Sequence, residues 1–192
     1  MRIGVLGLQG DFEEHRVVLA RIGVDSRDVR LPQHLDGLDG LIIPGGESTT
    51  IGKMAMDFGL LKPLRAFGLE KAIWGTCAGA IFMSKDIHRT QPLLKLMDIV
   101  VERNAFGRQV DSFETDLDVP ALAVVNHNHA PYHAVFIRAP LIESVQENVE
   151  VLARLPDGRI VAARQGRLLA TSFHPELTLD DRFHRYFVEL AK

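Results

Sequence analysis

The stretch KAIWGTCAGAIFMSK, residues 71–85, decides the fold. It begins with the apolar segment Lys71–Gly75, which is typical of a buried strand, and ends with Ala78–Lys85, which is typical of a helix. Between them, Gly75-Thr76-Cys77-Ala78-Gly79 has the form G-x-C-x-G. This is the thiol counterpart of the turn that exposes a nucleophile between a strand and a helix. On its own the pattern also fits a buried structural cysteine beside two packing glycines.

The residues before this stretch alternate between strand and helix in the same way. Such alternation predicts a parallel sheet with helices on both faces, an α/β three-layer domain of the flavodoxin-like kind. The expected elements are a strand over Met1–Leu8, a helix opened by Asp11 with Glu14 in a capping-box arrangement, strands over Val24–Val29 and Gly40–Ile43, and a helical stretch from about Thr49 interrupted near Gly59 and Pro63.

The second half of the chain has a different pattern. Val149–Leu155, Arg159–Arg164 and Leu168–Ser172 are short apolar segments separated by turn residues, which predicts an antiparallel meander. A last helix over Leu179–Ala191 is expected to place Leu179, Phe183, Phe187 and Leu190 on one face. No linker interrupts the chain, so we expect one domain over residues 1–192.

Composition excludes several classes of protein. The 192 residues carry 22 basic and 25 acidic side chains, a net charge of −3, without a basic block that would favour nucleic acid. Ala72–Ser84, the longest uncharged stretch near the centre, is shorter than the roughly 20 residues of a membrane span. A single cysteine, Cys77, permits no internal disulfide. We therefore expect a cytoplasmic protein that binds neither nucleic acid nor membrane.

A base and its orienting partner for Cys77 are expected at the end of another strand. His174-Pro175-Glu176 follows Leu168–Ser172, and the proline holds an imidazole and a carboxylate close together. A cysteine nucleophile needs such a pair, in which the carboxylate orients the histidine. A surface histidine beside a turn is the alternative interpretation of His174.

A glycine pair follows a third strand. Pro44-Gly45-Gly46-Glu47-Ser48 comes directly after Gly40–Ile43, and its backbone amides are free to face a developing oxyanion. A plain turn or a phosphate-binding loop would use the same residues, but the spacing of a Walker A loop is absent.

Together these segments resemble class I glutamine amidotransferases, and in particular the glutaminase subunits of pyridoxal 5′-phosphate synthase. The resemblance runs from residue 4 to residue 178. It is carried by Gly4-Val5-Leu6-Gly7-Leu8-Gln9-Gly10, Pro44–Thr50, Gly75–Gly79, Val101-Glu102-Arg103-Asn104-Ala105-Phe106-Gly107-Arg108-Gln109, Val135-Phe136-Ile137-Arg138-Ala139-Pro140 and Ser172–Thr178.

The resemblance implies an enzyme, a glutaminase that forms L-glutamate and ammonia from L-glutamine through a γ-glutamyl thioester. Cys77 would be the nucleophile, His174 the general base and acid, and Glu176 the residue that orients His174. The backbone amides of Gly46 and Ala78 would hold the oxyanion. The residues that match glutamine-binding positions are Gly46, Glu47, Ser48, Arg103, Ile137 and Arg138.

The resemblance also implies a partner. Ammonia would pass through a tunnel to a barrel-fold synthase subunit, which makes pyridoxal 5′-phosphate, within a large hetero-oligomer. The chain itself would need no cofactor and no metal. Two alternatives stay open: a glutaminase subunit of another amidotransferase pathway, and a non-catalytic thiol sensor on the same fold.

One segment, Val124–His133, departs from the family because it is longer than the usual connection. It contains His127, His129 and His133, which raises the question of a metal site. No cysteine or carboxylate nearby is expected to complete a ligand set. We therefore interpret it as an exposed insertion.

Overall fold

The computed structural model describes residues 1–103, 112–126 and 130–192. Its helices are α1 (Phe12–Arg21), α2 (Ser48–Asp57), α3 (Leu61–Glu70), α4 (Ala78–Met83) and α5 (Arg182–Leu190). Its strands are β1 (Arg2–Leu6), β2 (Asp25–Val29), β3 (Gly40–Ile43), β4 (Ala72–Thr76), β5 (Ser84–Asp86), β6 (Met97–Glu102), β7 (Ser112–Leu117), β8 (Tyr132–Ile137), β9 (Leu141–Val145), β10 (Glu150–Arg154), β11 (Ile160–Gln165) and β12 (Leu168–Thr171).

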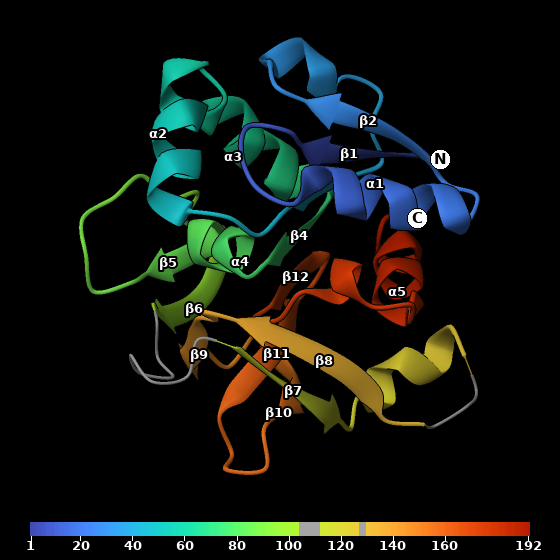
Figure 1. Cartoon of the computed structure of the whole chain (residues 1–192). Coiled ribbons are helices and arrows are strands. Elements are labelled where there is room, and N and C mark those ends of the chain that lie inside the picture. The colour runs from blue at the N-terminus through green and yellow to red at the C-terminus, as the bar shows by residue number, and fades with distance from the viewer. Residues whose placement is uncertain (104–111, 127–129) are drawn as a thin grey trace.

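In the described residues, ten strands form one mixed sheet in the order β2-β1-β3-β4-β12-β11-β9-β6-β5, with β10 paired to β11 (Figure 1). From β2 to β12 every neighbouring pair is parallel. From β12 onward the pairs are antiparallel, except that β5 runs parallel to β6. A separate ribbon pairs β7 with β8. The predicted fold class, parallel strands followed by a C-terminal antiparallel meander, is confirmed.

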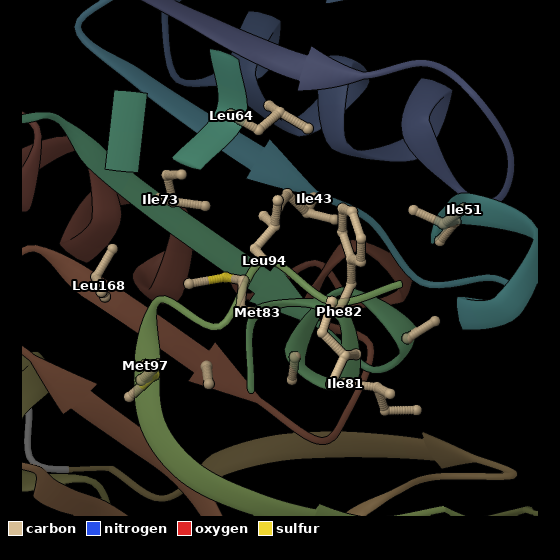
Figure 2. Close-up of a cluster of buried hydrophobic side chains, with 14 of the residues drawn as sticks. Ile43, Ile51, Leu64, Ile73, Ile81, Phe82, Met83, Leu94, Met97 and Leu168 are labelled. Atoms are coloured by element: carbon tan, nitrogen blue, oxygen red, sulfur yellow. The ribbon is translucent and has the colours of Figure 1, made fainter. Parts of the chain in front are cut away.

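Successive side chains of a strand point to opposite faces of the sheet. The apolar side chains on each face are buried under helices or other strands. Leu41 and Ile43 of β3 join one buried cluster, and Ile42 joins the other. Figure 2 shows the first cluster, where Ile43 and Ile73 of the sheet pack with side chains of α2, α3 and α4. On the other face, α1, α5 and the β7–β8 ribbon supply the cover.

The parallel order brings three predicted segments together. Residues that follow β3, β4 and β12 must lie at one edge of the sheet, since these strands are adjacent and parallel. Ligand sites of α/β proteins form at this edge. The glycine loop, Cys77 and His174 follow these three strands.

Several local predictions are wrong. Asp11 precedes α1 as expected, but its side chain makes no capping hydrogen bond and faces His174 instead. Pro63 does not interrupt a helix, because it lies in the first turn of α3, where proline is tolerated. The helix after Cys77 ends at Met83, and β5 follows it. Leu179 lies before α5 and is 89% exposed, so it takes no part in the apolar face of that helix.

Candidate active site

Cys77 lies in a strained turn between β4 and α4. Its φ is 47°, a left-handed conformation that side chains other than glycine rarely adopt. The turn also requires its flanking glycines. A Cβ on Gly79 would lie 2.0 Å from the carbonyl oxygen of Ile43, and one on Gly75 would lie 2.5 Å from the backbone of Gly79. These contacts give the physical reason for the G-x-C-x-G pattern, and the Cys77 N–H is fixed by the Thr171 carbonyl at 2.8 Å.

The structure brings His174 and Glu176 to this cysteine. A hydrogen bond of 2.7 Å joins His174 Nδ1 to Glu176 Oε1. Because Nδ1 is engaged in this way, Nε2 is the nitrogen that remains for the hydrogen bond between His174 and the Cys77 side chain. Both side chains are buried. Cys77, His174 and Glu176 therefore form the hydrogen-bonded series that the predicted roles of nucleophile, base and orienting carboxylate require.

The charges around His174 favour its protonated form. Burial lowers the pKa of His174, but hydrogen bonds to Cys77 and Glu176 outweigh burial and raise this pKa to about 10. An imidazolium next to a thiol stabilises the thiolate, which is the reactive form of cysteine. Asp11 adds a further carboxylate, with Oδ2 at 3.5 Å from His174 Nδ1.

The glycine loop packs directly against the triad. A Cβ on Gly45 would lie 2.6 Å from His174 Cε1, so only glycine fits beside the imidazole. The Gly45 carbonyl accepts a hydrogen bond from the Asp11 N–H at 3.2 Å, and Gly46 has a φ of +145°. The Glu47 N–H donates to Gln9 Oε1 at 2.7 Å. The segment that follows β1 therefore holds this loop in place.

Glu47 and Arg103 form an ion pair, with 2.9 Å between Glu47 Oε1 and Arg103 Nη2. Arg103 Nη1 also donates to Thr49 Oγ1 and to Gln91 Oε1, each at 3.1 Å. The Glu47 carboxylate caps α2 by accepting from the Thr49 and Thr50 N–H groups. Burial raises the pKa of Glu47, but these hydrogen bonds from Thr50 and Thr49 lower it to about 2.

The remaining predicted binding residues are Ile137, Arg138 and Ser48. Cys77 Sγ is 4.0 Å from the Ile137 carbonyl oxygen at the end of β8. Arg138 follows with a φ of 44°, a second strained backbone position. Ser48 is buried, and its hydroxyl accepts a hydrogen bond from Gln91 Nε2 at 3.2 Å. Ala78, the other predicted oxyanion residue, is the first residue of α4.

Two residues beside the triad were not among the predicted site residues: Asp11, which is a neighbour of His174, and His15, which is a neighbour of Glu176. His15 Nε2 is 3.4 Å from Glu176 Oε2. The signal was their spacing, since residues four apart lie on one face of a helix. Asp11, His174 and Glu176 also offer ligand atoms within 4.8 Å of one another, but the His174 nitrogen concerned is hydrogen-bonded to Glu176.

Of the three histidines in the predicted insertion, the structure describes only His133. His127 and His129 lie outside the described residues. His133 lies on β8, with Nε2 at 2.8 Å from Glu114 and Nδ1 at 2.9 Å from Asp116. The view that no carboxylate lies near this histidine is wrong, because β7 supplies two of them across the ribbon. Both ring nitrogens are engaged by these carboxylates.

No helix within the described ranges is long and apolar enough to cross a membrane.

Comparison with known proteins gives consistent results. Residues 5–192 match the model of the SNO glutamine amidotransferase family. The chain is 58% identical to the pyridoxal 5′-phosphate synthase subunit PdxT of Herpetosiphon aurantiacus, with 99% of this chain and 100% of the relative covered. It is 55% identical to the protein of the same name from Roseiflexus castenholzii, covering 99% and 100%. A solved structure titled as a glutamine amidotransferase superposes with a TM-score of 0.90 at 52% identity, covering 98% of both chains.

Proposed function

We propose a function from one premise: the chain belongs to the SNO glutamine amidotransferase family. The protein is a glutaminase that hydrolyses L-glutamine and supplies ammonia for the synthesis of pyridoxal 5′-phosphate. The observation that carries the proposal at the level of chemistry is the hydrogen-bonded set Cys77, His174 and Glu176 at the end of two parallel strands. We treat residues 1–192 as one glutaminase domain. A cytoplasmic location stays a prediction from the single cysteine.

The first half of the reaction forms a thioester. The thiolate of Cys77 attacks the side-chain amide carbon of glutamine, and the negative charge that develops on the amide oxygen is held by the backbone amides of Ala78 and Gly46. His174 gives its proton to the departing nitrogen, and ammonia leaves. Glu176 keeps the imidazole in the orientation that this transfer needs.

The second half restores the enzyme. His174, now neutral, takes a proton from water, and the hydroxide attacks the carbonyl carbon of the γ-glutamyl thioester. The carbon–sulfur bond breaks, which releases L-glutamate and regenerates the thiolate beside a protonated His174. No further reactant is needed.

Glutamine binding uses charge complementarity. Arg103 and Arg138 neutralise the α-carboxylate, since a guanidinium binds a carboxylate through two hydrogen bonds. Gly46, Glu47, Ser48 and Ile137 line the same site. Glu47 now pairs with Arg103, so the free protein already holds this guanidinium beside the glycine loop.

The partner of this chain is the barrel-fold synthase subunit, in a large hetero-oligomer that passes ammonia from one subunit to the other. The relatives are named as subunits of a synthase, which supports a complex. Docking would act on the Gly45–Gly46 peptide, because glycines reorient at low cost. In this structure the Gly45 carbonyl binds the Asp11 N–H, a contact that a peptide flip must break.

Ammonia release from glutamine, with and without the synthase subunit of the same organism, tests the proposal. We expect little release from the chain alone and an increase of about 10²–10³-fold with the partner, the effect of restoring one oxyanion-hole donor. Full activity that added synthase does not change would favour a free-standing glutaminase. Absence of ammonia release with the partner present would contradict the proposed function.

A further inference from the structure

Behind the triad lies a second, fully buried pair of histidines, His15 of α1 and His184 of α5. The oxygen of Glu176 that does not bind His174 faces this pair. Glu176 Oε2 lies 3.4 Å from His15 Nε2, and both side chains are wholly buried. In the described residues this oxygen accepts no hydrogen bond of good geometry, so the 3.4 Å approach of His15 Nε2 is an electrostatic contact. A buried carboxylate oxygen needs a donor, and the His15 ring is the group in position to supply one.

The His15 ring contacts side chains of β4 and α5. Its Nδ1 lies 2.9 Å from His184 Nε2, and its Nε2 lies 3.2 Å from Thr76 Oγ1. The Trp74 ring packs edge-on against both histidines, with centroid distances of 5.7 Å to His15 and 4.9 Å to His184. The position of His15 is therefore fixed by β4 and α5 as well as by its own helix.

The surroundings also select the tautomer of His15. Burial lowers the pKa of His15 to about 3, although Glu176 raises it, so the ring carries a single proton at neutral pH. With that proton on Nε2, the ring donates to Thr76 Oγ1, turns the positive end of the N–H dipole toward Glu176 Oε2 at 3.4 Å, and accepts at Nδ1 from His184 Nε2–H. The reverse arrangement would place a lone pair against the carboxylate and would give His184 a proton on Nδ1. That atom is buried without a partner in the described part of the chain. A buried N–H without an acceptor is costly, so the first arrangement is favoured.

We infer that His15 is a positioning residue for the glutaminase reaction: its Nε2–H faces the free oxygen of Glu176 and stabilises the carboxylate that orients His174, while His184 sets the tautomer of His15. This inference rests on the proposed function. It makes Glu176 a carboxylate with a catalytic histidine on one oxygen and a neutral, structural histidine on the other. Because His15 is buried and does not reach the glycine loop, its loss lowers kcat and leaves KM unchanged.

The test compares two substitutions in the complex with the synthase subunit. His15→Leu removes the donor at similar volume, and we expect kcat to fall by about 10–100-fold, the range for a residue that orients another ligand or base. His15→Gln keeps an N–H donor near the position of Nε2 and restores most of kcat. Val18→Ala, a buried change on the same helix, is the control for a loss of stability without a loss of the donor. Wild-type kcat in His15→Leu overturns the inference.

A double substitution separates a positioning role from a structural one. In the Glu176→Gln background, His15→Leu should lower kcat no further, because its action passes through the carboxylate. An equal loss in both backgrounds contradicts the inference. If the wild-type complex releases no ammonia, the proposed function fails instead, so the two failures are distinguishable.

A measurement without catalysis covers the case in which His15→Leu does not fold. Nitrogen-15 NMR of the wild-type chain, labelled at histidine, reports which ring nitrogen of His15 carries the proton. We expect a proton on Nε2 at neutral pH. A proton on Nδ1 would overturn the inference whatever the variants do.

Discussion

The parallel and antiparallel halves of the molecule contribute different residues to the candidate active site. The parallel half, β2-β1-β3-β4-β12, is followed at its carboxyl edge by the glycine loop, Cys77 and His174. The antiparallel half, β11-β9-β6-β5 with β10 and the β7–β8 ribbon, contributes Arg103 after β6 and Ile137 and Arg138 at the end of β8. The residues proposed to react thus lie on one half and the arginines proposed to bind glutamine on the other. The comparison teaches that substitutions of Cys77 and His174 should change the chemical step, and that substitutions of the two arginines should change the affinity for glutamine.

The largest effect is expected in the parallel half. Cys77→Ala and His174→Ala should each lower kcat by about 10⁴-fold or more, because the triad acts as a unit. Glu176→Gln should lower kcat less, since an orienting residue is less costly to lose than the base. Ammonia release with saturating glutamine measures both effects, and circular dichroism checks folding. More than about a hundredth of wild-type turnover in Cys77→Ala would contradict the mechanism, because no second cysteine exists.

The second effect belongs to the antiparallel half. Arg103→Ala and Arg138→Ala should raise KM about 10–150-fold and change kcat little, which corresponds to about 1.5–3 kcal/mol for a hydrogen bond to a charged group. Arg154→Ala is the matched control, since Arg154 lies on β10 in the same half and binds the Gly158 carbonyl in the adjoining turn. A fall in kcat with an unchanged KM would assign the two arginines another role.

A third, smaller effect concerns the pH dependence of stability, in which the buried histidines His15 and His184 differ from the exposed His133. Burial lowers the pKa of both His15 and His184 to about 3, whereas hydrogen bonds to Asp116 and Glu114 raise the pKa of His133. Below about pH 6.5 the unfolded chain protonates His15 and His184 and the folded chain does not. The free energy of unfolding should therefore fall between about pH 6.5 and 4.5, by up to about 1.4 kcal/mol per pH unit for each of the two.

Urea denaturation at pH 6, 5.5 and 5 measures this decline. A doubly substituted His15→Gln, His184→Gln chain is the control and should lose most of the pH dependence. His133 should contribute little at these pH values, because its pKa is raised in the folded chain and both states are mostly protonated below the ordinary histidine pKa. Stability that rises as the pH falls from 6 to 5 would contradict the account of the two buried histidines.

The smallest effect is expected on the β7–β8 ribbon. His133 is exposed between Glu114 and Asp116, and exposed ion pairs contribute little to stability. His133→Ala should leave kcat, KM and the melting temperature unchanged within error. Added Zn²⁺ followed by a chelator should give the same result for the wild type and the variant. A zinc-dependent stabilisation lost in His133→Ala would instead support a metal site in this segment.

The parallel half could be predicted from the sequence, and much of the antiparallel half could not. β1, β3 and β4 are apolar runs that end at glycines or turns, so composition alone marks them. β7, SFETDL, alternates exposed and half-buried positions and carries two acidic residues, so no apolar run marks it. β5 has three residues with two exposed, which leaves no pattern at all.

The residues of the candidate site also differ in how far the sequence could predict them. Cys77, His174 and the glycine loop were marked by turn chemistry at strand ends. The ring of His184 contacts a side chain 169 residues away, and no local pattern encodes that partner. The capping role predicted for Asp11 was wrong because a nearby imidazole competes for the same carboxylate. Tertiary contacts, rather than local preference, decide such polar residues.

Inactivation by a glutamine analogue that carries an electrophilic diazoketone tests the division of labour most directly. With the synthase subunit present, the maximum inactivation rate and the half-saturating concentration are measured for the wild type, His174→Ala and Arg103→Ala. Mass spectrometry locates the adduct. We expect one adduct on Cys77, a lower maximum rate at unchanged half-saturation in His174→Ala, and a higher half-saturating concentration at unchanged maximum rate in Arg103→Ala. An adduct on another residue, or a change of the same constant in both variants, would contradict the account.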